Sequence, residues 1–67
     1  MLGLKPIKTL PIREKIAATL REAILSRKIP AGEVLTLEST AQELGVSITP
    51  VREAFQILAR DGLLELK

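Results

Sequence analysis

The sequence predicts one small, mainly α-helical domain built from three helices, and three observations support this fold class. Apolar residues recur at helical spacing in three separate segments, with helix-interrupting residues between them. A tight turn at Gly45-Val46-Ser47 separates the second segment from the third. The chain has only 67 residues, so it forms one domain. A domain of this size buries about 60% of its unfolded surface, and we expect it to be marginally stable.

The first helix is predicted from about residue 11 to residue 27. Pro11 suits an opening turn, where a backbone N–H is not needed. The apolar residues of this helix recur at helical spacing and are assigned to the core: Ile12, Ile16, Leu20, Ala23 and Ile24. Residues 1–10 are predicted to form a flexible N-terminal arm, because Gly3 and Pro6 break any regular pattern.

The second helix is predicted over Leu37–Leu44. Thr36 is a suitable N-cap, and Gly45 suits the left-handed position that follows a helix. The apolar positions of this helix share one face: Leu37, Ala41 and Leu44. Between the first two helices there is room for only a very short strand, at Val34 and Leu35.

The third helix is predicted to begin after Ser47, its N-cap, and to stop at Asp61-Gly62. Pro50 falls in its first turn, where proline is tolerated. At about 100° per residue, the apolar residues form one arc: Val51, Ala54, Phe55 and Leu58. The polar residues lie broadly opposite: Thr49, Arg52, Glu53, Gln56 and Arg60. Leu63–Leu66 then has the pattern of a strand that is just beginning.

A tight turn followed by a helix with an outward polar face is how a helix-turn-helix protein meets DNA. Arg52 has no acidic residue three or four positions away, so no ion pair within its helix occupies the guanidinium. We therefore predict double-stranded DNA as the partner, with contacts from Ser47, Ile48, Thr49, Arg52 and Gln56. Two alternatives stay open: Ser47 only caps its helix, and Ile48 either packs on the second helix or meets a thymine methyl group.

Composition argues against catalysis, because the chain contains no cysteine and no histidine and no evident pair of clustered carboxylates. We predict that it is not an enzyme and that it uses neither a metal nor a cofactor. Charged residues interrupt every apolar run, so no membrane segment is predicted. The lack of disulfides suits a soluble protein of the reducing cytoplasm.

The charged residues are unevenly distributed along the chain. Residues 1–35 hold seven basic and three acidic residues, whereas residues 36–67 hold three basic and five acidic residues. A basic face is the usual electrostatic footprint of a nucleic-acid-binding protein, and the half with the third helix lacks one. An alternative function therefore remains: a helical protein-interaction or dimerisation module that keeps the fold without contacting DNA.

Four blocks of sequence carry a family resemblance: Leu20 to Leu25, Ile29 to Leu35, Leu44 to Phe55, and Arg60 to Leu63. In order and spacing they closely resemble the winged helix-turn-helix domain of GntR-family bacterial transcription regulators. The string Thr-Pro-Val-Arg-Glu-Ala at residues 49–54 looks like the FadR-type subgroup, whose C-terminal half is an all-helical effector and dimerisation domain. The resemblance thus covers about residues 11–66.

The resemblance implies a winged helix-turn-helix DNA-binding domain over residues 11–67, with a minimal β component and a truncated wing. It also implies a full-length homodimeric regulator, a ligand-responsive repressor whose small-molecule effector binds a C-terminal domain that this sequence lacks. Glu38 and Ile48 depart from the pattern, because the family has arginine at both positions. Ser47, Thr49 and Arg52 match, so we carry over DNA binding but not the usual operator preference.

Overall fold

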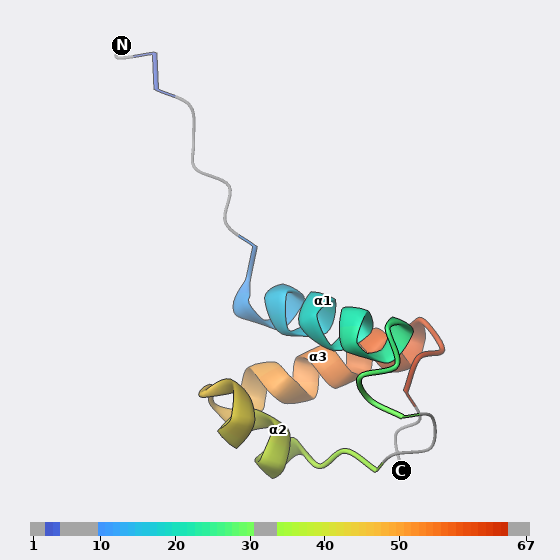
Figure 1. Ribbon diagram of the computed structural model, residues 1–67. Helices are drawn as coiled ribbons and strands as arrows, with labels where there is room; N and C mark the ends of the chain where they lie inside the picture. The colour runs from blue at the N-terminus through green and yellow to red at the C-terminus, as the bar shows by residue number, and fades with distance from the viewer. Residues whose placement is uncertain (1–2, 5–9, 31–33, 65–67) are drawn as a thin grey trace.

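The computed structural model describes residues 3–4, 10–30 and 34–64. Within these ranges the chain forms three helices, α1 (Ile12–Leu25), α2 (Leu37–Leu44) and α3 (Ile48–Arg60), and no strand. Helix α3 is central, because it packs against both α1 and α2 (Figure 1). The predicted mainly α fold with three helices is confirmed.

Helix α1 ends at Leu25, two residues before the predicted boundary. Arg27 adopts a left-handed conformation with φ of 63°, which turns the backbone away from the helix axis. The N–H of Arg27 donates to the Ile24 carbonyl at 3.2 Å, and this bond satisfies one carbonyl of the last turn. A residue with a side chain is rare at such a position, so the helix end is strained.

Helices α2 and α3 end in the same way, with a glycine in the left-handed region. Gly45 has φ of 68°, and the N–H of Val46 donates to the Ala41 carbonyl at 3.0 Å. Gly62 has φ of 77°, and the N–H of Leu63 donates to the Leu58 carbonyl at 2.9 Å. Both are Schellman motifs, in which glycine avoids the steric penalty of a Cβ atom. The predicted stops at these two glycines are confirmed.

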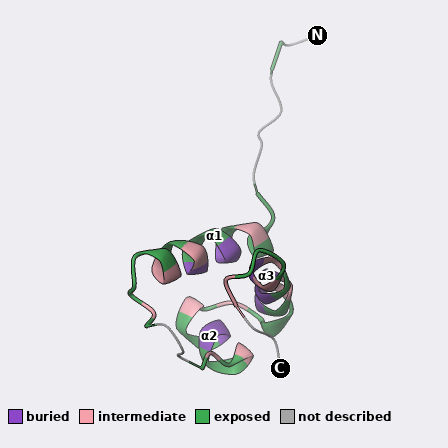
Figure 2. Ribbon diagram, turned by 90° about the vertical axis from the view of Figure 1, so that its right-hand side faces the viewer, coloured by how far each residue is buried: buried purple, intermediate pink, exposed green. Residues whose placement is uncertain are grey.

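The core lies between the facing sides of the three helices (Figure 2). Its buried apolar residues are Ile16, Ala17, Leu20, Ala41, Val51, Ala54, Phe55 and Leu58. All four apolar residues of α3 that the helical wheel assigned to one arc are therefore buried, as predicted. The prediction that Ile12 belongs to the core is wrong, because this first residue of α1 is 50% exposed. Ala17, which is 1% exposed, contributes to the core from α1 instead.

The prediction of a very short strand at Val34 and Leu35 is wrong. A strand needs a partner for its backbone ladder, and within the described ranges neither residue forms a backbone hydrogen bond to another segment. Leu63 and Leu64 likewise lie outside any strand, while the rest of that predicted strand, residues 65 and 66, falls outside the described residues. Leu35, Leu63 and Leu64 pack instead against the edge of the core.

Two ion pairs join α1 to α3 and its C-terminal end. Arg13 Nη1 lies 3.8 Å from Glu53 Oε2, and Arg21 Nη2 lies 2.8 Å from Asp61 Oδ2. The partners in both pairs are separated by the same number of residues, so the two helices run side by side in the same direction (Figure 1). Such half-exposed pairs contribute little stability, so the orientation of α3 against α1 depends mainly on the buried apolar residues between them.

Candidate DNA-binding interface

The turn between α2 and α3 sets the direction of the third helix. Thr36 begins α2 by accepting a hydrogen bond from the Ser39 N–H at 3.1 Å, which confirms the predicted N-cap. The Schellman motif at Gly45 then reverses the chain, and α3 begins after only Val46 and Ser47. A helix, a three-residue turn and a second helix packed on the first constitute a helix-turn-helix unit.

All five residues predicted to contact DNA are exposed on α3 or at its N-cap: Ser47, Ile48, Thr49, Arg52 and Gln56. Ile48, Arg52 and Gln56 follow one another at intervals of four residues, so their side chains form a single stripe along the helix. Thr49 lies beside this stripe on the same exposed side. The core face of α3 lies beside this stripe and is covered by the other helices, so a partner meets the exposed stripe and not the buried apolar residues.

Ser47 occupies the predicted N-cap position, with φ of −75° and ψ of 164°, but its side chain makes no capping hydrogen bond. A capping hydroxyl accepts from the backbone N–H of the second or third helical residue, and Pro50, the third residue here, has no N–H. Only the N–H of Thr49 could therefore serve a side-chain cap, and the Ser47 side chain does not accept from it. The predicted N-cap position of Ser47 is thus confirmed, but its side chain does not cap α3, and its hydroxyl is available to a partner.

The first turn of α3 presents backbone N–H groups without a competing anion. It contains no acidic residue, whereas the first turn of α2 contains Glu38, which is exposed. A helix N-terminus carries a partial positive charge, and a carboxylate in the first turn offsets it. The two helices therefore differ in the electrostatic environment of their N-termini. The partial positive charge of α2 is offset by the Glu38 carboxylate, whereas that of α3 has no acidic residue in its first turn.

Arg52 and Glu53 are adjacent in sequence but face different surroundings. Glu53 is half-buried and forms its ion pair with Arg13 of α1. Arg52 is exposed, and among the described residues it has no ion pair and no side-chain hydrogen bond. The helical wheel had grouped the two together, because a wheel ignores the position of a neighbouring helix. Glu53 therefore does not share the surroundings of Arg52, which is the charged residue of the exposed stripe.

The acidic excess in the second half of the chain is partly neutralised by α1. Glu53 and Asp61 both lie against arginines of that helix, at 3.8 Å and 2.8 Å. Of the charged residues on α3 itself, Arg52 and Arg60 remain exposed without an acidic partner among the residues that the structure describes. The acidic composition of residues 36–67 therefore does not make the exposed surface of α3 acidic.

Ile48 does not belong to the core. Its side chain is 38% exposed, and it is not among the residues that pack against the core cluster. Leu44 and Val46, which precede it, do pack there. Both alternatives for Ile48 therefore stay open: more than half of its surface is covered within the domain, and the rest is exposed at the first residue of α3.

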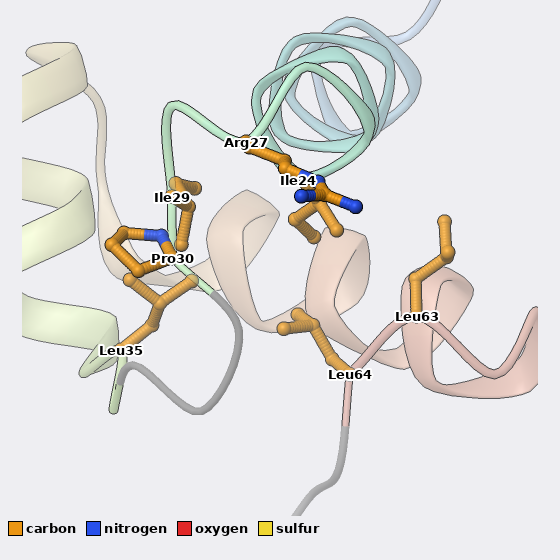
Figure 3. A pocket seen from close by; sticks show the side chains of 7 residues that line it. All are labelled: Ile24, Arg27, Ile29, Pro30, Leu35, Leu63 and Leu64. Carbon is orange, nitrogen blue, oxygen red and sulfur yellow. The ribbon is translucent and has the colours of Figure 1, made fainter.

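A separate apolar groove of about 580 Å³ lies at the C-terminal ends of α1 and α3 (Figure 3). It is lined by Ile24, Arg27, Ile29, Pro30, Leu35, Leu63 and Leu64. Among the described residues that line it, Arg27 is the only titratable one, and the others are apolar.

The described ranges offer neither a metal site nor a membrane span. They contain no cluster of carboxylates, histidines or cysteines suited to a metal ion. None of their helices has the length and apolar character needed to cross a membrane.

The three-helix core, the tight turn and the exposed polar stripe define a helix-turn-helix domain. Sequence comparison specifies the class further. The chain belongs to the GntR family of bacterial regulatory proteins, whose family model matches residues 12–67.

Its relatives include an HTH-type transcriptional regulator in an unstable DNA locus of Streptomyces ambofaciens, 37% identical over 54 residues. That match covers 81% of this chain and 23% of the relative. The gluconate operon transcriptional repressor of Bacillus subtilis is 40% identical over 53 residues, covering 79% of this chain and 22% of the repressor. The chain thus spans less than a quarter of these relatives. No solved structure matches it.

Proposed function

We propose that this domain binds double-stranded DNA by placing α3 in the major groove. The observation that carries the proposal is the exposed stripe of Ile48, Arg52 and Gln56 on the helix that follows the turn. The arginine of this stripe has no intramolecular partner in the part of the chain that the structure describes. The second helix of a helix-turn-helix unit uses such a surface to read base edges, mainly with its N-terminal residues.

Each residue of the interface has a distinct chemical task in this proposal. Arg52 donates either to a guanine, through both of its terminal nitrogens, or to a phosphate. Thr49 contacts a base or a phosphate from the first turn of α3. Ser47 assists with its hydroxyl, which makes no capping hydrogen bond in α3. Gln56 assists one turn beyond Arg52. The backbone N–H groups at the start of α3 favour a nearby phosphate.

Amide chemical-shift mapping with a nonspecific duplex at low salt tests this proposal. DNA binding through α3 predicts the largest perturbations over residues 47–56 and small ones at the groove residues Ile24 and Leu64. The perturbations should decrease as salt is added, because phosphate contacts release counterions. A spectrum unchanged by the duplex would contradict DNA binding and favour the alternative of a protein-interaction module.

For the full-length protein we propose a cytoplasmic, homodimeric transcription regulator, a ligand-responsive repressor in which a C-terminal domain binds a small-molecule effector. The name of the Bacillus subtilis relative, a transcriptional repressor, supports this direction. The string at residues 49–54 supports the FadR-type subgroup, which predicts an all-helical effector domain. Light scattering and far-ultraviolet circular dichroism of a full-length protein test the dimer and the helical domain. A monomer, or a β-rich C-terminal half, would contradict the respective proposal.

The domain boundaries remain a proposal as well: an arm over residues 1–10 and the DNA-binding domain over residues 11–67. Helix α1 begins at Ile12, so a chain shortened to residues 11–67 keeps every described helix. We expect the shortened chain to show the same thermal unfolding midpoint as the full 67-residue chain. A lower midpoint would show that the arm contributes to the folded domain.

A further inference from the structure

We propose that Ile48 reads a thymine methyl group and thereby determines the operator preference of this domain; this inference rests on the proposed DNA binding by α3. The observation behind it is an aliphatic side chain, 38% exposed, at the first residue of α3. In the major groove the methyl group of thymine is the apolar feature that distinguishes this base. An apolar side chain in the N-terminal part of the recognition helix can pack against this methyl group.

Exposure alone does not carry the argument, because single exposed aliphatic residues are common on protein surfaces. Ile48 differs from the other exposed aliphatic residues in its neighbours. It stands between Ser47 and Thr49, both exposed, and in the same stripe as Arg52 and Gln56. Val34, which is 81% exposed, lies in the segment before α2 and has no place on α3. The surface around Ile48 therefore combines an apolar side chain with hydrogen-bonding side chains. Base edges in the major groove likewise present both hydrogen-bonding groups and the thymine methyl group.

Neither folding nor helix formation calls for isoleucine at this position. Ile48 lies outside the buried core cluster, and 38% of its surface remains exposed, so part of its apolar surface is open to a partner. Isoleucine is also a weaker helix former than alanine, leucine or arginine, since its branched Cβ loses rotamer freedom. The exposed part of this side chain is therefore available for a contact outside the domain.

The spacing of the stripe predicts where the thymine lies. Residues four apart on a helix are separated by about 6 Å along its axis, and successive base pairs of DNA by about 3.4 Å. With α3 lying along the groove, Ile48 and Arg52 therefore contact positions about two base steps apart. The domain should prefer sites in which a thymine lies about two base pairs from the position contacted by Arg52.

Removal of single methyl groups from the DNA tests this inference. A binding-site selection with the 67-residue chain first provides a duplex, and each thymine is then replaced in turn by deoxyuridine, which lacks only the methyl group. Loss of the methyl group that Ile48 covers should weaken binding about three- to fivefold, the value of one buried methyl group. The other thymines should show little effect.

Three variants complete the test. In Ile48→Ala the same deoxyuridine should have no effect, whereas in Val34→Ala, the control, the three- to fivefold effect should persist. Val34 is 81% exposed, so Val34→Ala should unfold at the wild-type temperature. Ile48 is 38% exposed, so binding by Ile48→Ala is compared at a temperature at which its measured unfolding curve shows it to be folded. In Ile48→Arg the selected base should change from thymine to guanine, the base that arginine reads bidentately.

The outcomes separate this inference from the function on which it rests. Salt-sensitive binding with no deoxyuridine effect, or with the same effect in Ile48→Ala as in the wild type, would overturn the role of Ile48 and leave DNA binding intact. Absence of binding to any duplex at low salt would overturn both.

Discussion

The substitution Arg52→Ala tests the interface most directly, because the structure separates its effect on folding from its effect on binding. Arg52 is exposed and has no intramolecular partner among the described residues, so its loss should change the free energy of unfolding by less than about 0.5 kcal/mol. A guanidinium that binds a guanine through two hydrogen bonds contributes about 1–3 kcal/mol to discrimination. Loss of this contact corresponds to about a 5- to 150-fold weaker affinity.

Fluorescence anisotropy over a series of salt concentrations measures both affinity and the kind of contact. If Arg52 binds a guanine, Arg52→Ala should lose affinity for the selected duplex and lose preference at one base pair. If it binds a phosphate, the affinity should fall for every sequence, and the slope of log K against log salt should decrease in magnitude by about one.

Arg60→Ala is the matched control, because Arg60 is also exposed on α3 but lies about 12 Å further along the helix axis. We expect it to affect binding less than Arg52→Ala, since the N-terminal part of α3 enters the groove. Wild-type affinity and wild-type salt slope in Arg52→Ala would refute the placement of this arginine at the DNA. A larger loss in Arg60→Ala would indicate that the other end of α3 contacts DNA.

Three further predictions concern the stability of the scaffold and are measured by urea or thermal unfolding. Leu58 is completely buried, so Leu58→Ala should lower the free energy of unfolding by about 2–5 kcal/mol, and a loss below about 1 kcal/mol would contradict its central place in the core. Gly45 has φ of 68° and open space where a Cβ atom would lie, so Gly45→Ala should lose about 1–2 kcal/mol from backbone strain alone; an unchanged midpoint would argue against the left-handed turn. Arg27 adopts φ of 63°, so Arg27→Gly should gain about 0.5–1 kcal/mol, and a destabilised variant would show that the arginine side chain has a structural role.

Most of the fold was predictable because it depends on local features of the chain. The bounds of α2 and α3, the cap at Thr36 and the two glycine stops follow from residue type and spacing within a few positions. The sequence shows only part of the reason for the missing cap at Ser47: Pro50, three residues later, offers no N–H, whereas the N–H of Thr49 is present and is not used. The absence of a strand at Val34 and Leu35 could not be predicted from the sequence, because a strand exists only when another segment pairs with it.

The candidate interface shows the same division. Periodicity alone identified the buried arc of α3 and its exposed side, since both follow from the rotation per residue along a helix. The separate environments of Arg52 and Glu53 depend instead on α1, which comes from a distant part of the chain and supplies Arg13 to one of the two neighbours. The exposure of Ile48 likewise depends on how α2 packs against α3, because the edge of an apolar arc is buried or exposed by its neighbours. The local sequence thus determined the three helices and which side of each is apolar. The packing of the helices against one another determined which polar and apolar side chains stay exposed to a partner.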